Sequence, residues 1–310
     1  MQRVFGLVAL TTILVGCGGG GGGGSTNGGG GGGGSIPTVQ FTSWSDTRPN
    51  TEIVAPTIST TATYTENSNG DITSVSEFSS FYGGEFRETF DANGAITSAS
   101  ITTSDGDRLT FSKPDGAQYY SIFDGAGFLA TNSTETSFVI GAEPVPQGWN
   151  YQTFGVWSRS PTSSASGMVG ASSTGAFTQA SNIPTSGTAS FQGIAAGLYQ
   201  LSEFSTYITS ADMTLNVDFR NRTADFQTVN SVVTPDVATF ASSYPAIDLT
   251  GIMQLDPTRN SMSGTVESRF GMKGVIQGAF YGPNAQEVGG TFGLRGDGVE
   301  SYVGGFGGKR

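Results

Sequence analysis

An unbroken alternation of apolar and polar side chains in residues 211–220 constrains this chain most strongly. The apolar members are Met213, Leu215, Val217 and Phe219. In an extended strand successive side chains point to opposite faces, so this segment has one face suited to a core and one suited to water. No segment after residue 41 keeps apolar residues at helical spacing over three turns. We therefore predict an all-β chain.

Turn signals and proline placement predict two β domains. Asn69-Gly70 and Asn93-Gly94 separate alternating segments and favour tight type I′ hairpins, so residues 41–145 are predicted to form a small antiparallel N-terminal domain. Prolines and a glycine at positions 144, 146 and 148 mark the expected boundary. Residues 150–310 are then expected to form the second domain.

The second domain is predicted to be an antiparallel barrel of eight strands. Short alternating segments, counted from residues 156–159 onward, recur to the end of the chain. An up-and-down barrel pairs that many strands without leaving an exposed edge. Glycines lie inside several of these segments, at positions 251, 264, 278, 289, 290 and 293. We expect them to serve bends and bulges of the barrel wall.

The N-terminus has the features of a lipoprotein signal. Residues 1–16 combine a short cationic start with about a dozen mostly apolar residues, which is too short for a membrane span. Residues 14–17, LVGC, resemble the bacterial lipobox and end in the only cysteine, Cys17, which is the predicted lipidation site. Gly18 follows it, which favours an outer-membrane destination over inner-membrane retention. The alternative is an ordinary secretory signal that happens to contain a cysteine.

Two glycine tracts follow, at residues 18–24 and 28–34. Such a segment buries no apolar surface to offset its ordering entropy, so residues 17–40 are predicted to form a flexible tether. Its expected reach is roughly 25 Å. A phosphate-binding loop would need a preceding strand and a Lys or Ser/Thr at fixed spacing, and neither is present.

Several motifs resemble the β-barrel domain of the transferrin-binding protein B family of surface lipoproteins. The most specific is GAFYGPNAQEVGGTF at residues 278–292, which follows the pattern G-x-F-Y-G-P-x-A-x-E-x-G-G-x-F. GTASFQG at residues 187–193, LNVDF at residues 215–219 and FGGKR at residues 306–310 resemble further family segments. Members of this family have two lobes, each a handle domain plus an eight-stranded barrel, whereas this chain has room for a single lobe.

The resemblance implies a non-catalytic surface protein. It would capture a host protein or a haem- or iron-carrying ligand through loops and pass cargo to a TonB-dependent outer-membrane receptor. No family contact for transferrin aligns with a residue of this chain. The expected chain is a monomer, attached to the outer membrane through its lipid and displayed at the cell surface.

Composition excludes several other classes of function. The chain has no histidine, which excludes a Ser-His-Asp triad and His-ligated zinc or haem. Its net charge of −11 and lack of basic clusters argue against nucleic-acid binding. Carboxylates such as Glu85 and Glu88, or Asp212 and Asp218, have the spacing of ordinary solvated strand residues. We therefore expect no catalytic site, no metal and no cofactor.

Binding is expected at aromatic side chains in loops, because Tyr and Trp dominate interface hot spots. The candidates are Trp149 and Tyr151 near the domain junction and Tyr244 in a later loop. Structural packing is the competing explanation for all three. A second functional hypothesis is a lipocalin-like carrier that holds a small apolar ligand inside the barrel. A lumen filled by Phe, Met and Leu would disfavour it, and a cavity of about 300 Å³ or more would favour it.

Overall fold

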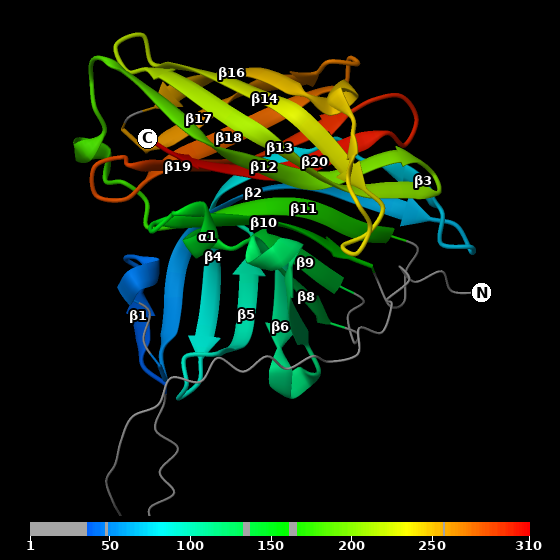
Figure 1. The fold of residues 1–310 in the computed structure, drawn as a ribbon, viewed down its shortest axis with the longest axis horizontal. Helices are drawn as coiled ribbons and strands as arrows, with labels where there is room; N and C mark the ends of the chain where they lie inside the picture. Colours follow the sequence, from blue (N-terminus) through cyan, green and yellow to red (C-terminus); the bar gives the residue numbers. More distant parts are fainter. Residues whose placement is uncertain (1–35, 47–48, 133–136, 161–165, 257) are drawn as a thin grey trace, which may run out of the picture.

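The computed structural model describes residues 36–46, 49–132, 137–160, 166–256 and 258–310, and it confirms the all-β fold class. Two sheets make up the molecule, one stacked on the other (Figure 1). The predicted signal peptide, Cys17 and the two glycine tracts lie outside the described residues. Thr38–Gln40, which were expected in the tether, instead form strand β1 and pair in parallel with β2. In the described part of the chain, no helix has the length and apolar character needed to cross a membrane.

The N-terminal sheet, which we call the handle, has eleven strands and curls almost into a barrel. Its path runs β6-β5-β4-β2-β11-β10-β9-β8-β7, while β1 and β3 pair with β2. Strands β6 and β8 lie in contact across the gap. The strands are β1 (Thr38–Gln40), β2 (Glu52–Glu66), β3 (Ile72–Val75), β4 (Ser79–Phe90), β5 (Ile96–Thr102), β6 (Arg108–Ser112), β7 (Gln118–Ile122), β8 (Gly127–Asn132), β9 (Ser137–Ala142), β10 (Gln152–Arg159) and β11 (Ser166–Gly175).

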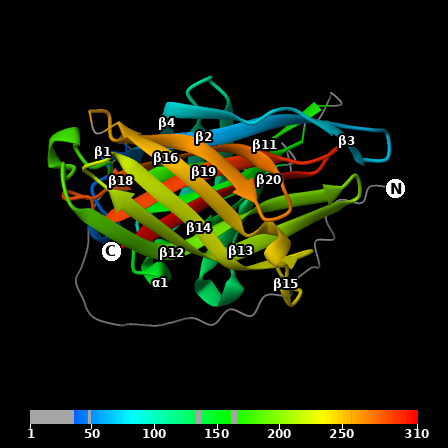
Figure 2. The same ribbon diagram turned by 90° about the horizontal axis from the view of Figure 1, so that it is seen from above.

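The C-terminal sheet is the predicted closed, eight-stranded antiparallel barrel. Each strand pairs with the next, and β12 closes the barrel against β20, with a short β15 added beside β14. Figure 2 shows these strands running obliquely across one another. The strands are β12 (Thr188–Ser202), β13 (Ser205–Asp218), β14 (Thr223–Thr234), β15 (Ser242–Ser243), β16 (Leu249–Asp256), β17 (Ser261–Ser268), β18 (Lys273–Tyr281), β19 (Glu287–Arg295) and β20 (Ser301–Lys309).

Helical structure is confined to single turns between strands. The short elements are η1 (Trp44–Asp46), η2 (Lys113–Asp115), η3 (Phe123–Gly125), α1 (Pro144–Gln147), η4 (Ala180–Asn182) and η5 (Pro245–Ile247). α1 ends at Gly148, whose positive φ of 67° terminates the turn. The prolines and glycine expected to mark a domain boundary therefore form one helical turn between β9 and β10 of the same sheet.

The boundary between the two sheets lies later in the sequence than predicted. Strands β10 and β11 were expected in the barrel, because residues 156–159 were counted as its first strand. In the structure β10 pairs with β9 and β11, and β11 pairs with β2, more than 100 residues earlier. The barrel begins only at Thr188. The reason is that alternation along β10 identifies a strand but carries no information about its partner.

The hairpins at Asn69-Gly70 and Asn93-Gly94 form where predicted but with a different turn. Only the glycine of each pair has a positive φ, 83° at Gly70 and 78° at Gly94. In the second hairpin Gly94 N–H donates to Asp91 O and Asp91 N–H donates to Ala95 O. This is a type I turn followed by a left-handed glycine, which closes a three-residue loop.

The barrel interior is filled by bulky side chains. Met213, Leu215, Val217 and Phe219 of the alternating segment point inward and are at most 5% exposed, as predicted. They pack with aromatic residues contributed by the other strands, which are Phe191, Phe226, Phe280, Phe292, Tyr302 and Phe306. Many of these rings meet in tilted or edge-to-face contacts. A filled lumen disfavours the carrier hypothesis.

The handle packs its long strands against the glycine-rich wall formed by β19 and β20. Phe154 and Gln152 of β10 lie directly over Gly305 and Gly307, where an added Cβ would come within 2.5 Å of the handle side chain. Gly289 and Gly293 face Ser173 and Phe78 in the same way. No register shift interrupts the pairing of β16 to β20, so the expected bulges at these glycines are absent. At this wall glycine instead allows close packing of the two sheets.

Polar side chains fix the relative position of the two sheets. Gln277 of the barrel donates to Ser59 O of the handle at 2.6 Å, and the hydroxyl groups of Thr60 and Thr291 lie 2.8 Å apart. At one edge, Tyr82 of β4 donates its hydroxyl proton toward the carbonyl oxygens of Met262 and Gly278. Buried hydrogen bonds of this kind specify one orientation of the handle on the barrel.

Candidate binding site at one barrel mouth

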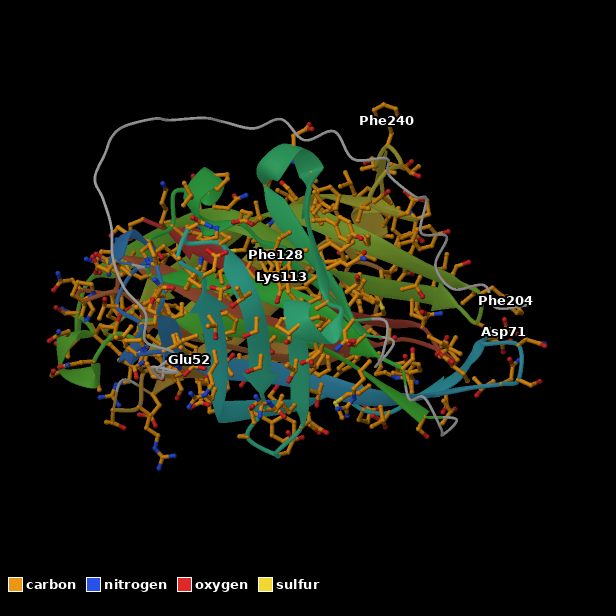
Figure 3. The ribbon with its side chains drawn as sticks, turned by 90° about the horizontal axis from the view of Figure 1, so that it is seen from below. Glu52, Asp71, Lys113, Phe128, Phe204 and Phe240 are labelled. Atoms are coloured by element: carbon orange, nitrogen blue, oxygen red, sulfur yellow. The ribbon has the colours of Figure 1, made fainter. Side chains whose placement is uncertain are left out.

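Three phenylalanines from three different loops are exposed at one end of the barrel. Phe204 lies in the β12–β13 hairpin, Phe240 between β14 and β15, and Phe270 in the β17–β18 hairpin. They are 75%, 96% and 79% exposed, the highest values for phenylalanine in the described part of the chain. We call these three residues the phenylalanine rim. Figure 3 shows Phe204 next to Asp71 of the handle, while Phe240 projects in a different direction, away from both.

The loop that carries Phe240 is ordered by its own hydrogen bonds. Asp236 Oδ1 accepts from Ala238 N–H at 2.8 Å and from the hydroxyl of Thr239 at 2.7 Å. The hydroxyl of Thr234 donates to Thr239 O, and Val237 packs against the core shared by the two sheets. Phe240 is therefore held out into solvent by a fixed loop, which lowers the entropy lost when a partner covers it.

The handle extends this end of the barrel through its β2–β3 hairpin. Ile72 N–H donates to Glu203 O at 3.2 Å, which joins the handle hairpin to the hairpin that carries Phe204. Asp71 and Glu203 add negative charge beside the rim. Arg269 directly precedes Phe270, so the charge along the rim is mixed, acidic beside Phe204 and basic beside Phe270. Exposed apolar side chains flanked by charges of both signs are suited to a partner surface with apolar anchors and complementary charges.

A pocket of about 290 Å³ opens at the same mouth of the barrel. Its lining residues are Tyr199, Leu201, Tyr207, Val233, Ser242 and Tyr244. The rings of Tyr199 and Tyr244 are 5.9 Å apart, and Tyr199 and Tyr207 are paired across β12 and β13. The pocket lies at the mouth, above the filled lumen, so it does not extend into the barrel as the carrier hypothesis requires.

Tyr199, at the floor of this pocket, is hydrogen-bonded to a carboxylate. Tyr199 donates its hydroxyl proton to Glu300 Oε1 at 2.7 Å. Burial, and then the negative charge and hydrogen bond of Glu300, raise the pKa of Tyr199 far above its ordinary value. The hydroxyl therefore stays protonated and remains a donor to Glu300 at any physiological pH.

The predicted binding residues occupy opposite ends of the barrel. Tyr244 lines the mouth pocket beside the rim. Trp149 and Tyr151 lie at the other end, where Trp149 is 3% exposed and packs on Phe154. The backbone N–H groups of Asn150 and Tyr151 donate to Glu287 at 2.7 and 3.0 Å. These contacts join the handle to the barrel, so the Trp149 side chain is used in packing and is not brought together with Tyr244.

The acidic side chains considered as possible sites are used in local structure, with one exception. Asp212 accepts from Asn230, Asp218 from Asn221, and Glu85 pairs with Arg87. Glu88, expected to be solvated, is only 8% exposed and lines a 40 Å³ cavity inside the handle. Burial, with a smaller contribution from Glu143, raises its pKa to about 8. The described residues contain no group of three potential metal-binding side chains.

Sequence reasoning missed the phenylalanine rim. Each of the three residues sits in a segment that also carries turn-forming residues, as in Phe270-Gly271, where polar residues are expected. A large apolar residue in a turn is the signal that could have identified them. Their placement at one end, however, depends on the order and direction of the barrel strands.

Comparison with known proteins supports the assignment of the barrel. Residues 183–310 match the family model of the C-lobe and N-lobe β barrels of transferrin-binding protein B. This confirms the resemblance inferred from the sequence motifs. No curated protein sequence matches the chain.

Among solved structures, a mutant of transferrin-binding protein B from Haemophilus parasuis is 15% identical, with a TM-score of 0.42, and the match covers 75% of this chain and 53% of that one. Transferrin-binding protein B from Neisseria meningitidis is 15% identical, with a TM-score of 0.38, and the match again covers 75% of this chain and 53% of that one. The N-lobe of lactoferrin-binding protein B from Moraxella bovis is 10% identical, with a TM-score of 0.37, covering 82% and 98%. This chain spans about half the length of the two transferrin-binding proteins.

Proposed function

We propose that this chain, whose C-terminal domain is a barrel of the transferrin-binding protein B type, is a lipid-anchored outer-membrane lipoprotein that captures a protein ligand without catalysis. The ligand would dock on the phenylalanine rim. The observation that carries the proposal is the exposure of Phe204, Phe240 and Phe270 on three loops at one end of the barrel. Large exposed apolar side chains on the loops of one surface are typical of protein interaction sites.

The ligand class follows from the relatives. The similar structures are transferrin-binding and lactoferrin-binding proteins, so an iron-carrying host protein is the first candidate, and a haem-carrying protein, implied by the family resemblance, is the second. The lipobox at Cys17 and the glycine tether would place the rim away from the membrane surface. A TonB-dependent outer-membrane receptor would be the acceptor of the released cargo.

A binding assay with matched variants tests the proposal. The full-length chain in detergent is immobilised, and transferrin, lactoferrin and haemoglobin are passed over it. Changing Phe204, Phe240 and Phe270 together to Ser is expected to weaken capture at least ten-fold, because hot-spot truncations each cost about 2 kcal/mol or more.

The control changes two exposed apolar residues away from the rim, Val145 and Ile252, to Ser. These are 75% and 59% exposed, in α1 at the opposite end and on β16. An equal loss of binding affinity in the rim variant and the control variant would show that the rim is not part of the binding surface. Absence of binding to all three ligands by the unchanged chain would reject the proposed ligand class.

A further inference from the structure

The two mouths of the barrel are both lined by aromatic rings but differ in what covers them. At the mouth near the β13–β14 hairpin, the guanidinium of Arg310 lies 5.3 Å from the ring centre of Phe191 and 6.0 Å from that of Phe219. That end is therefore capped by the chain's own cation through cation–π contacts. At the opposite mouth, no Lys or Arg of the described residues lies over the rings of Tyr199, Tyr207 or Tyr244.

We propose that this second mouth is a binding site for an organic cation, a quaternary or alkyl ammonium group, held by Tyr207 and Tyr244 above a floor formed by the buried ring of Tyr199. Three tyrosine rings line a pocket of about 290 Å³, which exceeds the size of a trimethylammonium group. Ring faces carry negative potential and attract such a cation, while the apolar walls from Leu201 and Val233 accommodate its methyl groups. The inference stands whether or not the phenylalanine rim binds a protein.

The charge around the pocket favours a positive ligand. Glu300 accepts from the Tyr199 hydroxyl at 2.7 Å, which places a carboxylate at the end of that side chain. Asp248 lies close enough to the adjoining Tyr302 to raise the pKa of that phenol, after burial. Arg269, Lys273 and Arg295 are on hairpins at the same end, but none of them lines the pocket. A neutral apolar ligand would gain nothing from the carboxylate, so charge distinguishes the two ligand classes.

Ligand-observed NMR titration of the full-length chain in detergent tests the site. The probes are tetramethylammonium, choline, a peptide bearing trimethyl-lysine, and 3,3-dimethylbutan-1-ol, the uncharged analogue of choline. We expect the cations to bind and the uncharged analogue to bind about ten-fold more weakly or not at all. Binding of choline as strong as that of the peptide would identify a free small molecule as the source, and preference for the peptide would identify a partner side chain.

Matched variants locate the binding to the pocket. Tyr244→Leu is expected to weaken tetramethylammonium binding several-fold, whereas Tyr244→Phe keeps the ring and should retain it. Glu300→Gln should also weaken binding by removing the nearby charge. Tyr120→Leu, in the handle, is the control. Equal binding of the cation and its uncharged analogue, or unchanged binding by Tyr244→Leu, would overturn the proposal. The unfolding temperature of each variant separates loss of the site from loss of the fold.

Discussion

Phe78 of the handle lies so close to Gly293 of the barrel that a Cβ on Gly293 would sit 2.4 Å from Phe78 Cγ. Gly293 follows Phe292, whose side chain points into the barrel core. The outer surface of β19 is therefore backbone at this point, and an aromatic ring of the other sheet fills the space. This contact illustrates why the last two strands are rich in glycine.

Gly293→Ala is expected to destabilise the chain by about 1–3 kcal/mol, because the added methyl group overpacks the contact between the two sheets. Chemical denaturation of Gly293→Ala, Phe78→Leu and the double variant measures it. If Phe78 is the obstacle, the double variant should be more stable than the sum of the single effects predicts. Additive effects would mean that the alanine is opposed by some other neighbour.

Gln152 and Gln277 form a matched pair of buried amides. Neither amide atom of Gln152 has a hydrogen-bond partner among the described residues, whereas Gln277 lacks a partner only at Oε1 and its Nε2 donates to Ser59 O at 2.6 Å. Gln152→Met should therefore stabilise the chain by about 1 kcal/mol, since it removes an unsatisfied buried group. Gln277→Met should destabilise it by about 1–3 kcal/mol. Thermal unfolding compares them, and a loss of stability in both variants would contradict the distinction.

Because the Glu88 carboxyl is buried, we expect the handle to lose stability as the pH rises. Its pKa is about 8 in the folded chain, against an ordinary value of 4.5. Between these pH values the folded state holds a proton on Glu88 that the unfolded state has released. The free energy of unfolding is therefore highest below pH 4.5 and declines as the pH rises to about 8. The total decrease in the free energy of unfolding over this pH range is up to about 5 kcal/mol.

The measurement is denaturant unfolding at pH 6 and pH 9, with Glu88→Gln beside the unchanged chain. The variant should be the more stable of the two at pH 9 and should show a smaller dependence on pH. Glu143→Gln is the control. That carboxyl is only partly buried, and its charge contributes less than burial does to the raised pKa of Glu88. An unaltered pH dependence in Glu88→Gln would show that this carboxyl is ionised in the folded chain.

We expect lipidation of Cys17 to attach the chain to the membrane. Cys17→Ser should release it from the membrane fraction of cells, because several buried acyl chains are needed for stable anchoring and the serine variant would have none. Fractionation with detection of the protein is sufficient, and Ser25→Ala in the following segment should remain membrane-bound. Retention of Cys17→Ser in the membrane would reject lipidation as the anchor.

Much of the fold could be predicted from local pattern alone. The alternation of residues 211–220 predicted β13 and its buried face, and the motifs of residues 278–292 predicted the barrel family. The same reasoning located Tyr244 in a loop but could not place it beside Tyr199 and Tyr207. Nor could it show that Trp149 is buried at the opposite end, because aromatic residues in loops serve both binding and packing.

By itself, the sequence determined that the chain forms strands, which faces of those strands are apolar, and that the C-terminal half closes into a barrel. These properties depend on alternation and turn chemistry within short segments. Only the tertiary structure decided that β10 and β11 join the handle, that Glu88 is buried, and that Phe204, Phe240 and Phe270 are exposed on loops of the same barrel end. The assignment of β11 depends on its pairing with β2, more than 100 residues earlier, and the burial of Glu88 depends on how the handle sheet curls. The loop positions depend on the order of the barrel strands. Strand partners and sheet curvature are set by the packing of whole sheets and cannot be inferred from alternation within one short segment.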